Sequence, residues 1–243
     1  MRRRTLLTML LYPVVTSAQV LSSQQKSSNI SEHFFDISEN QKIGIRELTT
    51  TPQKFVENNS DIEAAINGPY FSPNNKTQGI AYLADGHQLA DGNINYVRGY
   101  FSVNKNGNEV KVNETLLDGT GTLDEKLRNY WLVIGTHPLL VVNRAVHAQS
   151  REDRYKYDEQ RRIKRDYRSA IGTKYGKAIY FAVSEDKITM EEWAERLRSV
   201  GYLGAINLDG GPISQLAVRE NKIVKIKGQG TLPTRLVIFE YTK

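Results

Sequence analysis

The chain has 243 residues, of which 39% are hydrophobic and 25% are charged. This is ordinary usage for a domain that buries a core, so it excludes wholesale disorder. The 33 Lys and Arg residues include three at positions 2–4, and the 30 that remain without those three face 27 acidic residues. Such an even balance gives no support for a nucleic-acid partner. The lack of cysteine excludes disulfides, thiol catalysis and thiolate metal sites.

The first eighteen residues have the pattern of a secretory signal peptide. Arg2, Arg3 and Arg4 precede an apolar stretch at 6–15, and small residues end at Ala18. The apolar stretch is shorter than the ~20 residues that span a bilayer. We therefore expect cleavage after residue 18, no stable membrane insertion afterwards, and a periplasmic or secreted protein. Residues 19–40 are rich in Ser and Gln and are expected to form a flexible arm before a single domain at 41–243.

Short apolar runs separated by turn residues predict a series of strands from residue 41 onward. Asn106-Gly107 predicts a hairpin with a type I′ turn, which needs positive φ at both central residues. A second hairpin, at 215–226, is expected to turn at Glu220-Asn221. The other predicted strands are 43–48, 64–67, 80–84, 100–104, 110–113, 131–135, 139–142, 178–183, 205–208 and 235–241.

One helix is clearly predicted, from Thr189 to Val200. Thr189 and Glu192 have the spacing of a capping box, and apolar residues at 193, 194, 197 and 200 fall on one helical face. Gly201 occupies the position where a left-handed residue ends a helix. With strands in the majority, we expect an α+β fold, a strand-dominated single domain with a few helices packed on mixed sheets.

The segment 205–214 (AINLDGGPIS) places a carboxylate where a buried strand ends. Asp209 is followed by Gly210 and Gly211, and Ser214 supplies a nearby hydroxyl. The glycines permit close approach of a ligand, and successive N–H groups in such a turn can bind an anion. A tight turn in which Asp209 caps its own loop is the alternative interpretation.

Two further segments place polar side chains at the ends of predicted strands. In 65–71 (AINGPYF), the amide of Asn67 could orient a sugar hydroxyl or a water, although Asn-Gly-Pro is also common turn chemistry. In 168–173 (RSAIGT), Arg168 could hold a phosphate through two parallel hydrogen bonds. A surface arginine in a charged stretch is the alternative for Arg168.

Cofactor and metal motifs are missing from the sequence. The chain has neither a Walker loop nor a GxGxxG followed by a helix, and Ser214 lacks the context of a nucleophile elbow. We therefore expect no cofactor and no imidazole-rich metal site. The four histidines show no metal-ligand spacing; they are His33, His87, His137 and His147.

The order of these segments resembles that of the phosphodiester glycosidase family. Residues 65–71 resemble the family's Ala-x-Asn-Gly-Gly-aromatic-Phe stretch, with Pro69 at the second glycine. Residues 79–86 resemble its strand and Asp-Gly turn, and 138–141 its Pro-Leu-Leu-Val strand. Residues 168–172 resemble its Arg-Thr-Ala-Ile-Gly stretch, and 207–214 its Asn-Leu-Asp-Gly-Gly motif, with Ile213 replacing a serine.

The resemblance implies a hydrolase that cleaves a sugar 1-phosphodiester at the glycosidic C–O bond. Together with the expected signal peptide, it implies an exported enzyme that acts on envelope or extracellular glycans. Asp209, Arg168 and Asn67 would be its catalytic residues, with Asp85 or Asp91 as a second carboxylate if one is needed. Two alternatives stay open: a phosphodiesterase of the same fold that cleaves P–O, and a non-catalytic glycan-binding domain of the cell envelope. The implied substrate-binding residues are Gly68, Tyr70, Gly79, Gly210, Gly211 and Ser214.

Overall fold

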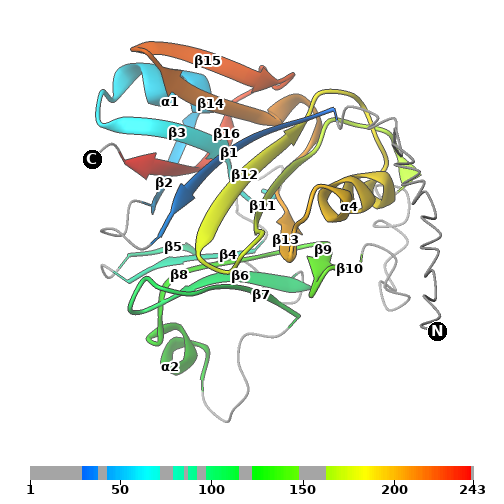
Figure 1. Ribbon diagram of the computed structural model, residues 1–243. Coiled ribbons are helices and arrows are strands. Elements are labelled where there is room, and N and C mark those ends of the chain that lie inside the picture. The colour runs from blue at the N-terminus through cyan, green and yellow to red at the C-terminus, as the bar shows by residue number, and fades with distance from the viewer. Residues whose placement is uncertain are drawn as a thin grey trace, which may run out of the picture.

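Three antiparallel β-sheets form most of the molecule (Figure 1). This computed structural model describes residues 29–37, 43–71, 79–84, 87–91, 97–114, 122–147 and 163–241. Strands dominate, as expected, but the expectation of mixed sheets is wrong because the paired strands are antiparallel in all three sheets. Hairpins join consecutive strands such as β11 and β12, whereas parallel pairing would need long crossover connections.

The largest sheet has six strands and carries the N-terminal strand at one edge. Its order is β1 (Ile30–Asp36), β12 (Ala178–Ser184), β11 (Ser169–Thr173), β13 (Gly204–Asn207), β9 (Leu139–Val142) and β10 (Ala145–Val146). The pairing of β1 with β12 runs from Ile30 opposite Ser184 to Asp36 opposite Ala178. Residues 30–36 therefore belong to the sheet, which corrects their expected place in a flexible arm. Helix α4 (Met190–Ser199) packs against β9 and β10 (Figure 1).

Two five-stranded sheets complete the fold. One has the order β15 (Ile223–Gly228), β14 (Gln215–Glu220), β3 (Ile62–Asn67), β16 (Thr234–Tyr241) and β2 (Ile43–Thr50). The other has the order β5 (His87–Asp91), β4 (Ile80–Leu83), β8 (Tyr130–Thr136), β6 (Gly99–Asn104) and β7 (Val110–Asn113).

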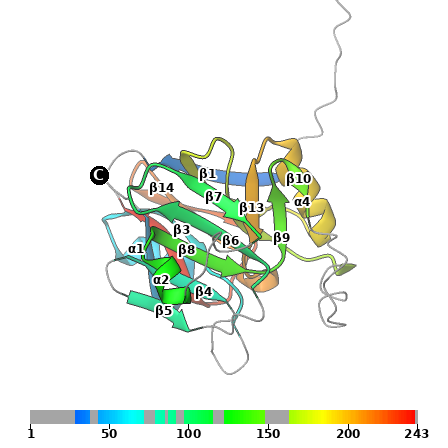
Figure 2. The same cartoon turned by 90° about the horizontal axis from the view of Figure 1, so that it is seen from below.

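One hydrophobic core joins the three sheets. Phe181 of β12, Ile66 of β3 and Phe101 of β6 are all completely buried in the same cluster. Helix α1 (Pro52–Asn58) covers β3 and β14, and α2 (Leu123–Leu127) lies beside β8 (Figure 2). Among the described residues, no helix has the length and apolar character needed to cross a membrane.

The predicted helix is confirmed. Thr189 accepts a hydrogen bond from the Glu192 amide, and the Glu192 carboxylate accepts one from the Thr189 amide. Gly201 follows with φ of 98°, as a left-handed residue after the helix should.

Both predicted hairpins are present, but their turns differ from the expectation. In the β14–β15 hairpin the left-handed residues are Asn221 and Lys222, one position later than expected. Between β6 and β7 only Gly107 is left-handed, so the type I′ assignment is wrong. The side chain of Asn104 accepts a hydrogen bond from the Asn108 amide at 3.0 Å and stabilises a longer loop instead.

Candidate active site

The three segments singled out in the sequence meet where β3, β11 and β13 bring two sheets together. The Asn67 side chain at the end of β3 donates to the Asp209 carbonyl over 2.8 Å. Its Oδ1 atom accepts a hydrogen bond from the Ser169 hydroxyl at the start of β11, also at 2.8 Å. The Asp209 amide in turn donates to the Gly68 carbonyl at 3.0 Å. Residues 67, 169 and 209 are therefore neighbours although the sequence separates them widely.

A second asparagine, Asn207, also joins the segment at 65–71 to the segment at 205–214. Asn207, at the end of β13, donates through Nδ2 to the Tyr70 hydroxyl at 2.7 Å. Asn67 and Asn207 are both completely buried. Each asparagine that ends a strand thus fixes the segment that follows the other strand. Since both ends of the Asn67 amide are engaged by the chain, we assign it to positioning the Asp209 loop rather than to binding a sugar directly.

Asp209 is the partly exposed member of the site. Its Oδ1 atom accepts a hydrogen bond from the Gly210 amide at 2.8 Å. The Gly211 amide donates to the Tyr167 carbonyl at 2.8 Å, and Gly211 has φ of 66°. The chain itself therefore occupies both glycine amides, and the anion-binding nest predicted from them is not formed. Because neither glycine has a side chain, the Arg168 guanidinium can approach Gly210 and the Asp166 carboxylate can approach Gly211.

Arg168 is buried beside these glycines rather than lying on the surface, with only 4% of its area exposed. Its Nε donates to the Ile188 carbonyl at 3.2 Å and Nη2 to the Lys164 carbonyl at 2.5 Å. Nη1 lies 3.6 Å from the place that a Cβ on Gly210 would occupy. Burial lowers the pKa of the Arg168 guanidinium, because the charged form loses hydration. A nearby anion would compensate that loss.

A second carboxylate near the two glycines belongs to Asp166, which the sequence analysis missed. An Oδ atom of Asp166 lies 3.1 Å from the place that a Cβ on Gly211 would occupy. Asp166 also pairs with the Lys164 ammonium at 3.1 Å. The only signal in the sequence was its position two residues before Arg168. Of the two carboxylates offered as the second one, Asp85 lies outside the described residues, and Asp91 ends β5.

Tyr70 and His137 form an aromatic pair beside the arginine. The Tyr70 ring stacks on the His137 imidazole with centroids 4.9 Å apart and planes inclined by 22°. The Tyr70 phenol and the Asp166 carboxylate both raise the pKa of Arg168 against the larger effect of burial. Sequence reasoning tested His137 only for metal-ligand spacing and therefore missed its stacking role.

The other expected binding residues contribute to packing. A Cβ on Gly68 would lie 2.8 Å from the Leu236 carbonyl, and one on Gly79 would lie 2.4 Å from the Gly135 carbonyl. Ser214 is completely buried, and its hydroxyl has no hydrogen-bond partner among the described residues. The two glycines thus permit close backbone contacts around the site.

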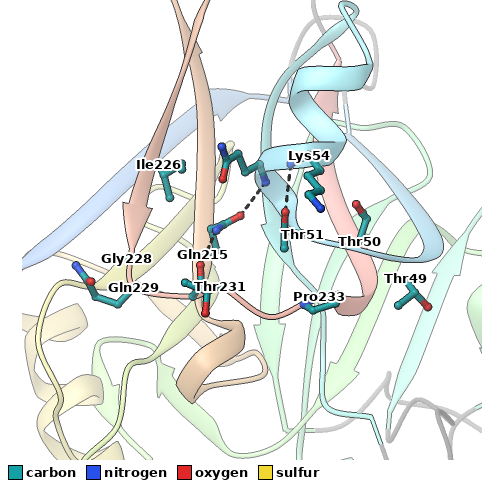
Figure 3. Close-up of a pocket in the computed structure, with 12 residues that line it drawn as sticks. Thr49, Thr50, Thr51, Lys54, Gln215, Ile226, Gly228, Gln229, Thr231 and Pro233 are labelled. Carbon is teal, nitrogen blue, oxygen red and sulfur yellow. Dashed lines mark hydrogen bonds between the residues drawn. The ribbon is translucent and has the colours of Figure 1, made fainter.

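A polar hollow of about 410 Å³ adjoins this region (Figure 3). Thr50, Thr51 and Lys54 line one side, and Gln215 and Thr231 line the other (Figure 3). The backbone amide of Gln215 donates to Asn67 Oδ1 at 3.2 Å, which links the wall of the hollow to the site. Among the described residues, no group of three or more His, Asp or Glu side chains could hold a metal ion.

A buried guanidinium close to a carboxylate and a phenol suits the binding of an anionic group. Residues 60–239 match the family model described as NAGPA: phosphodiester glycosidase. The chain belongs to this family of hydrolases, as the motif resemblance predicted.

Two solved structures are similar to the chain. The first is the zebrafish N-acetylglucosamine-1-phosphodiester alpha-N-acetylglucosaminidase catalytic domain auto-inhibited by pro-peptide, with a TM-score of 0.65 and 16% identity over 90% of this chain and 85% of that one. The second is a hypothetical protein from Synechocystis, with a TM-score of 0.56 and 14% identity over 88% of this chain and 59% of that one. Such low identities establish a shared fold alone. The comparison with curated proteins found no match.

Proposed function

We propose that the protein hydrolyses a sugar 1-phosphodiester by breaking the glycosidic C–O bond, and that it acts on envelope or extracellular glycans after export. The observation that carries the proposal is the buried Arg168 guanidinium, whose Nη1 lies 3.6 Å from the place that a Cβ on Gly210, the residue after Asp209, would occupy. Membership of the phosphodiester glycosidase family supports the substrate class. Export rests on the signal-like residues 1–18.

The phosphate is bound in this proposal by side chains and not by backbone amides. Arg168 supplies the positive charge in a buried setting, where charge-assisted hydrogen bonds are strong. Tyr70 lies close enough to influence that charge, and its oxygen already accepts from Asn207. The Tyr70 phenol is therefore a candidate to contact the phosphate beside Arg168.

Asp209 performs the chemical step at the anomeric carbon. As a general base it takes a proton from water while the water oxygen bonds to C1. The bond from C1 to the phosphate oxygen breaks, and the phosphate monoester leaves with the electron pair. Because this leaving group is a stable anion, no second carboxylate is needed to protonate it, in contrast to an ordinary glycoside. If Asp209 instead attacks C1 itself, a glycosyl-enzyme forms and water then hydrolyses it.

The anomeric configuration of the released sugar distinguishes these two routes. A single displacement by water inverts the configuration, whereas two displacements through a glycosyl-enzyme retain it. Proton NMR of the freshly formed sugar, recorded before mutarotation, therefore assigns the role of Asp209.

The bond that breaks is tested with isotopic water. The purified protein is incubated in oxygen-18 water with the C1 methyl phosphates of N-acetylglucosamine, glucose, galactose and mannose, and the products are analysed by mass spectrometry. We expect the label in the sugar. Label in methyl phosphate would mean P–O cleavage and would refute the proposal. An absence of turnover with all four would favour a glycan-binding protein.

Asp209→Asn is the decisive variant. The amide oxygen of Asn can still accept the Gly210 hydrogen bond, so the loop should keep its shape. We expect turnover to fall by at least ~100-fold, the usual contribution of a general base. Asp61→Asn, at an exposed carboxylate before β3, is the matched control and should retain full activity.

A further inference from the structure

A second polar pocket lies at the far end of the strands that carry the candidate site. It has a volume of about 520 Å³, and its lining includes Tyr175, Lys177, Asn113 and Asn143. It opens beside the start of β13 and the end of β11, where a Cβ on Gly204 would lie 2.6 Å from Val112 of β7. In Figure 2, one end of β7 lies next to β13.

The pocket and the candidate site occupy opposite ends of β11 and β13. Arg168 precedes β11 and Asp209 follows β13, whereas Thr173 and Gly204, at the other ends of the two strands, line the pocket. Five residues of extended chain separate the two places, which corresponds to ~17 Å at the usual rise of a strand. The pocket is thus separate from the candidate active site.

Exposed aromatic rings continue from this pocket across the neighbouring strands. Tyr175 is 74% exposed, and Phe34 of β1 is 61% exposed. Phe34 stacks on Tyr180 with ring centroids 5.3 Å apart, and the Lys174 ammonium lies 4.8 Å from the centroid of the same Tyr180 ring. Burial raises the pKa of Tyr180, and Tyr175 is close enough to raise it further. Rings held open to solvent offer apolar faces with a polar edge, which suits the faces of sugar rings.

The polar groups of the pocket complement hydroxyls. The amides of Asn113 and Asn143 each offer donors and an acceptor, and Lys177 adds a cationic donor. Among the described residues of the lining, Glu109 is the single carboxylate, and it pairs with Lys111 at 2.9 Å. Hydrolysis of a glycoside generally needs two carboxylates, so this lining suits binding without cleavage.

We propose that this pocket, with Tyr175 as its stacking surface, binds an oligosaccharide and holds a glycan substrate on the protein while the site at Asp209 acts. The anchoring role rests on the proposed function, but the binding itself does not. A glycan that is bound in the pocket and is long enough to reach Asp209 would enter the candidate active site in an intramolecular step. This raises the effective concentration of the substrate at that site.

Binding is tested by isothermal titration of the whole protein with chitohexaose, cellohexaose, maltohexaose and mannohexaose. We expect saturable binding of at least one of them. Tyr175→Ala should weaken it at least tenfold, whereas Tyr175→Phe, which keeps the ring, should restore it. Tyr241→Ala is the matched control, because Tyr241 is an exposed tyrosine on β16 outside the pocket.

Two outcomes would overturn the proposal. One is the absence of saturable binding with all four oligosaccharides at millimolar concentration. The other is binding that survives Tyr175→Ala but is lost in Asp209→Asn, since that would place the sugar in the candidate active site. Because binding is measured without turnover, a failure of the proposed hydrolysis would leave this result interpretable.

The anchoring role has its own measurement. For a phosphodiester carried on the bound glycan, Tyr175→Ala should raise KM about tenfold with kcat unchanged, the pattern of lost uniform binding. The small methyl phosphates should be hydrolysed equally well by both proteins. An unchanged KM for the glycan-borne substrate would refute anchoring even if the pocket binds sugar.

Discussion

Replacing Asn67 by alanine tests whether this side chain positions the site or binds the sugar. Its amide joins three segments through hydrogen bonds of 2.8, 2.8 and 3.2 Å with Asp209, Ser169 and Gln215. A buried group left without its partner costs ~1–3 kcal/mol. The Ser169 hydroxyl can rotate toward another acceptor, so the loss comes mainly from the Asp209 carbonyl and the Gln215 amide. We expect the free energy of unfolding to fall by about 4 kcal/mol, much of the ~5–15 kcal/mol typical of a domain.

Urea unfolding, followed by circular dichroism, measures this loss as a shift of the midpoint at constant slope. Asn129→Ala is the control, because Asn129 is exposed in a turn after α2, and it should change stability by less than ~0.5 kcal/mol. Adding Ser169→Ala to Asn67→Ala should cost less than the sum of the two single changes, because the residues share a hydrogen bond. A loss below ~1 kcal/mol, accompanied by a raised KM, would refute the positioning role and favour direct sugar binding.

Four further substitutions test the framework of the fold. Gly172→Ala should lower the free energy of unfolding by about 3 kcal/mol in urea titrations, because its Cβ would lie 2.4 Å from the Gly204 carbonyl. Gly201→Ala, with φ of 98° and no atom within 4 Å of its Cβ, should cost only about 1 kcal/mol, and equal losses would contradict this steric account. Thr189→Ala should cost about 1 kcal/mol through the lost cap of α4, and no shift of the unfolding midpoint would refute it. Hydrogen bonds from Arg196 lower the pKa of Asp186, so its contribution to stability is present above the ordinary aspartate pKa and is lost as pH falls through the folded value. Asp186→Asn should therefore flatten the decrease of thermal stability in acid, and an unchanged pH profile would count against this pair.

The fold was predictable where a local pattern decides the structure. The capping box at Thr189 and the hairpin of β14 and β15 depend on residues close in sequence, and both are present. Strand β1 was missed because its sequence has little alternation, and its partner β12 lies about 150 residues later. Its stability comes from that distant pairing, which local periodicity does not report.

The sequence predicted residues that lie close together in the structure, while their catalytic and binding roles stay predictions. Asp209, Arg168 and Asn67 lie close together because each lies at one end of β3, β11 or β13, and these strand ends are adjacent. Their hydrogen-bond partners followed only from the tertiary structure. The sequence assigned phosphate binding to the glycine amides, yet those amides bond to Asp209 and Tyr167 within the chain.

The hydrogen bonds of Asn67 and Asn207 make the geometry of the candidate site depend on the packing of two sheets. Asn67 comes from one sheet and Asn207 from another, and each fixes the segment after the other strand. The Asp209 backbone and the Tyr70 phenol are therefore positioned by the packing of two sheets, whereas the Asp209 carboxylate bonds to the Gly210 amide in its own loop. Because Asn67 and Asn207 are both buried, neither side chain can move alone without leaving polar groups unpaired. Changes in sugar preference should then arise at positions that Asn67 and Asn207 do not hold, such as Ile213 at the end of the short helix Gly211–Ile213, while the orientation of Asp209 stays the same.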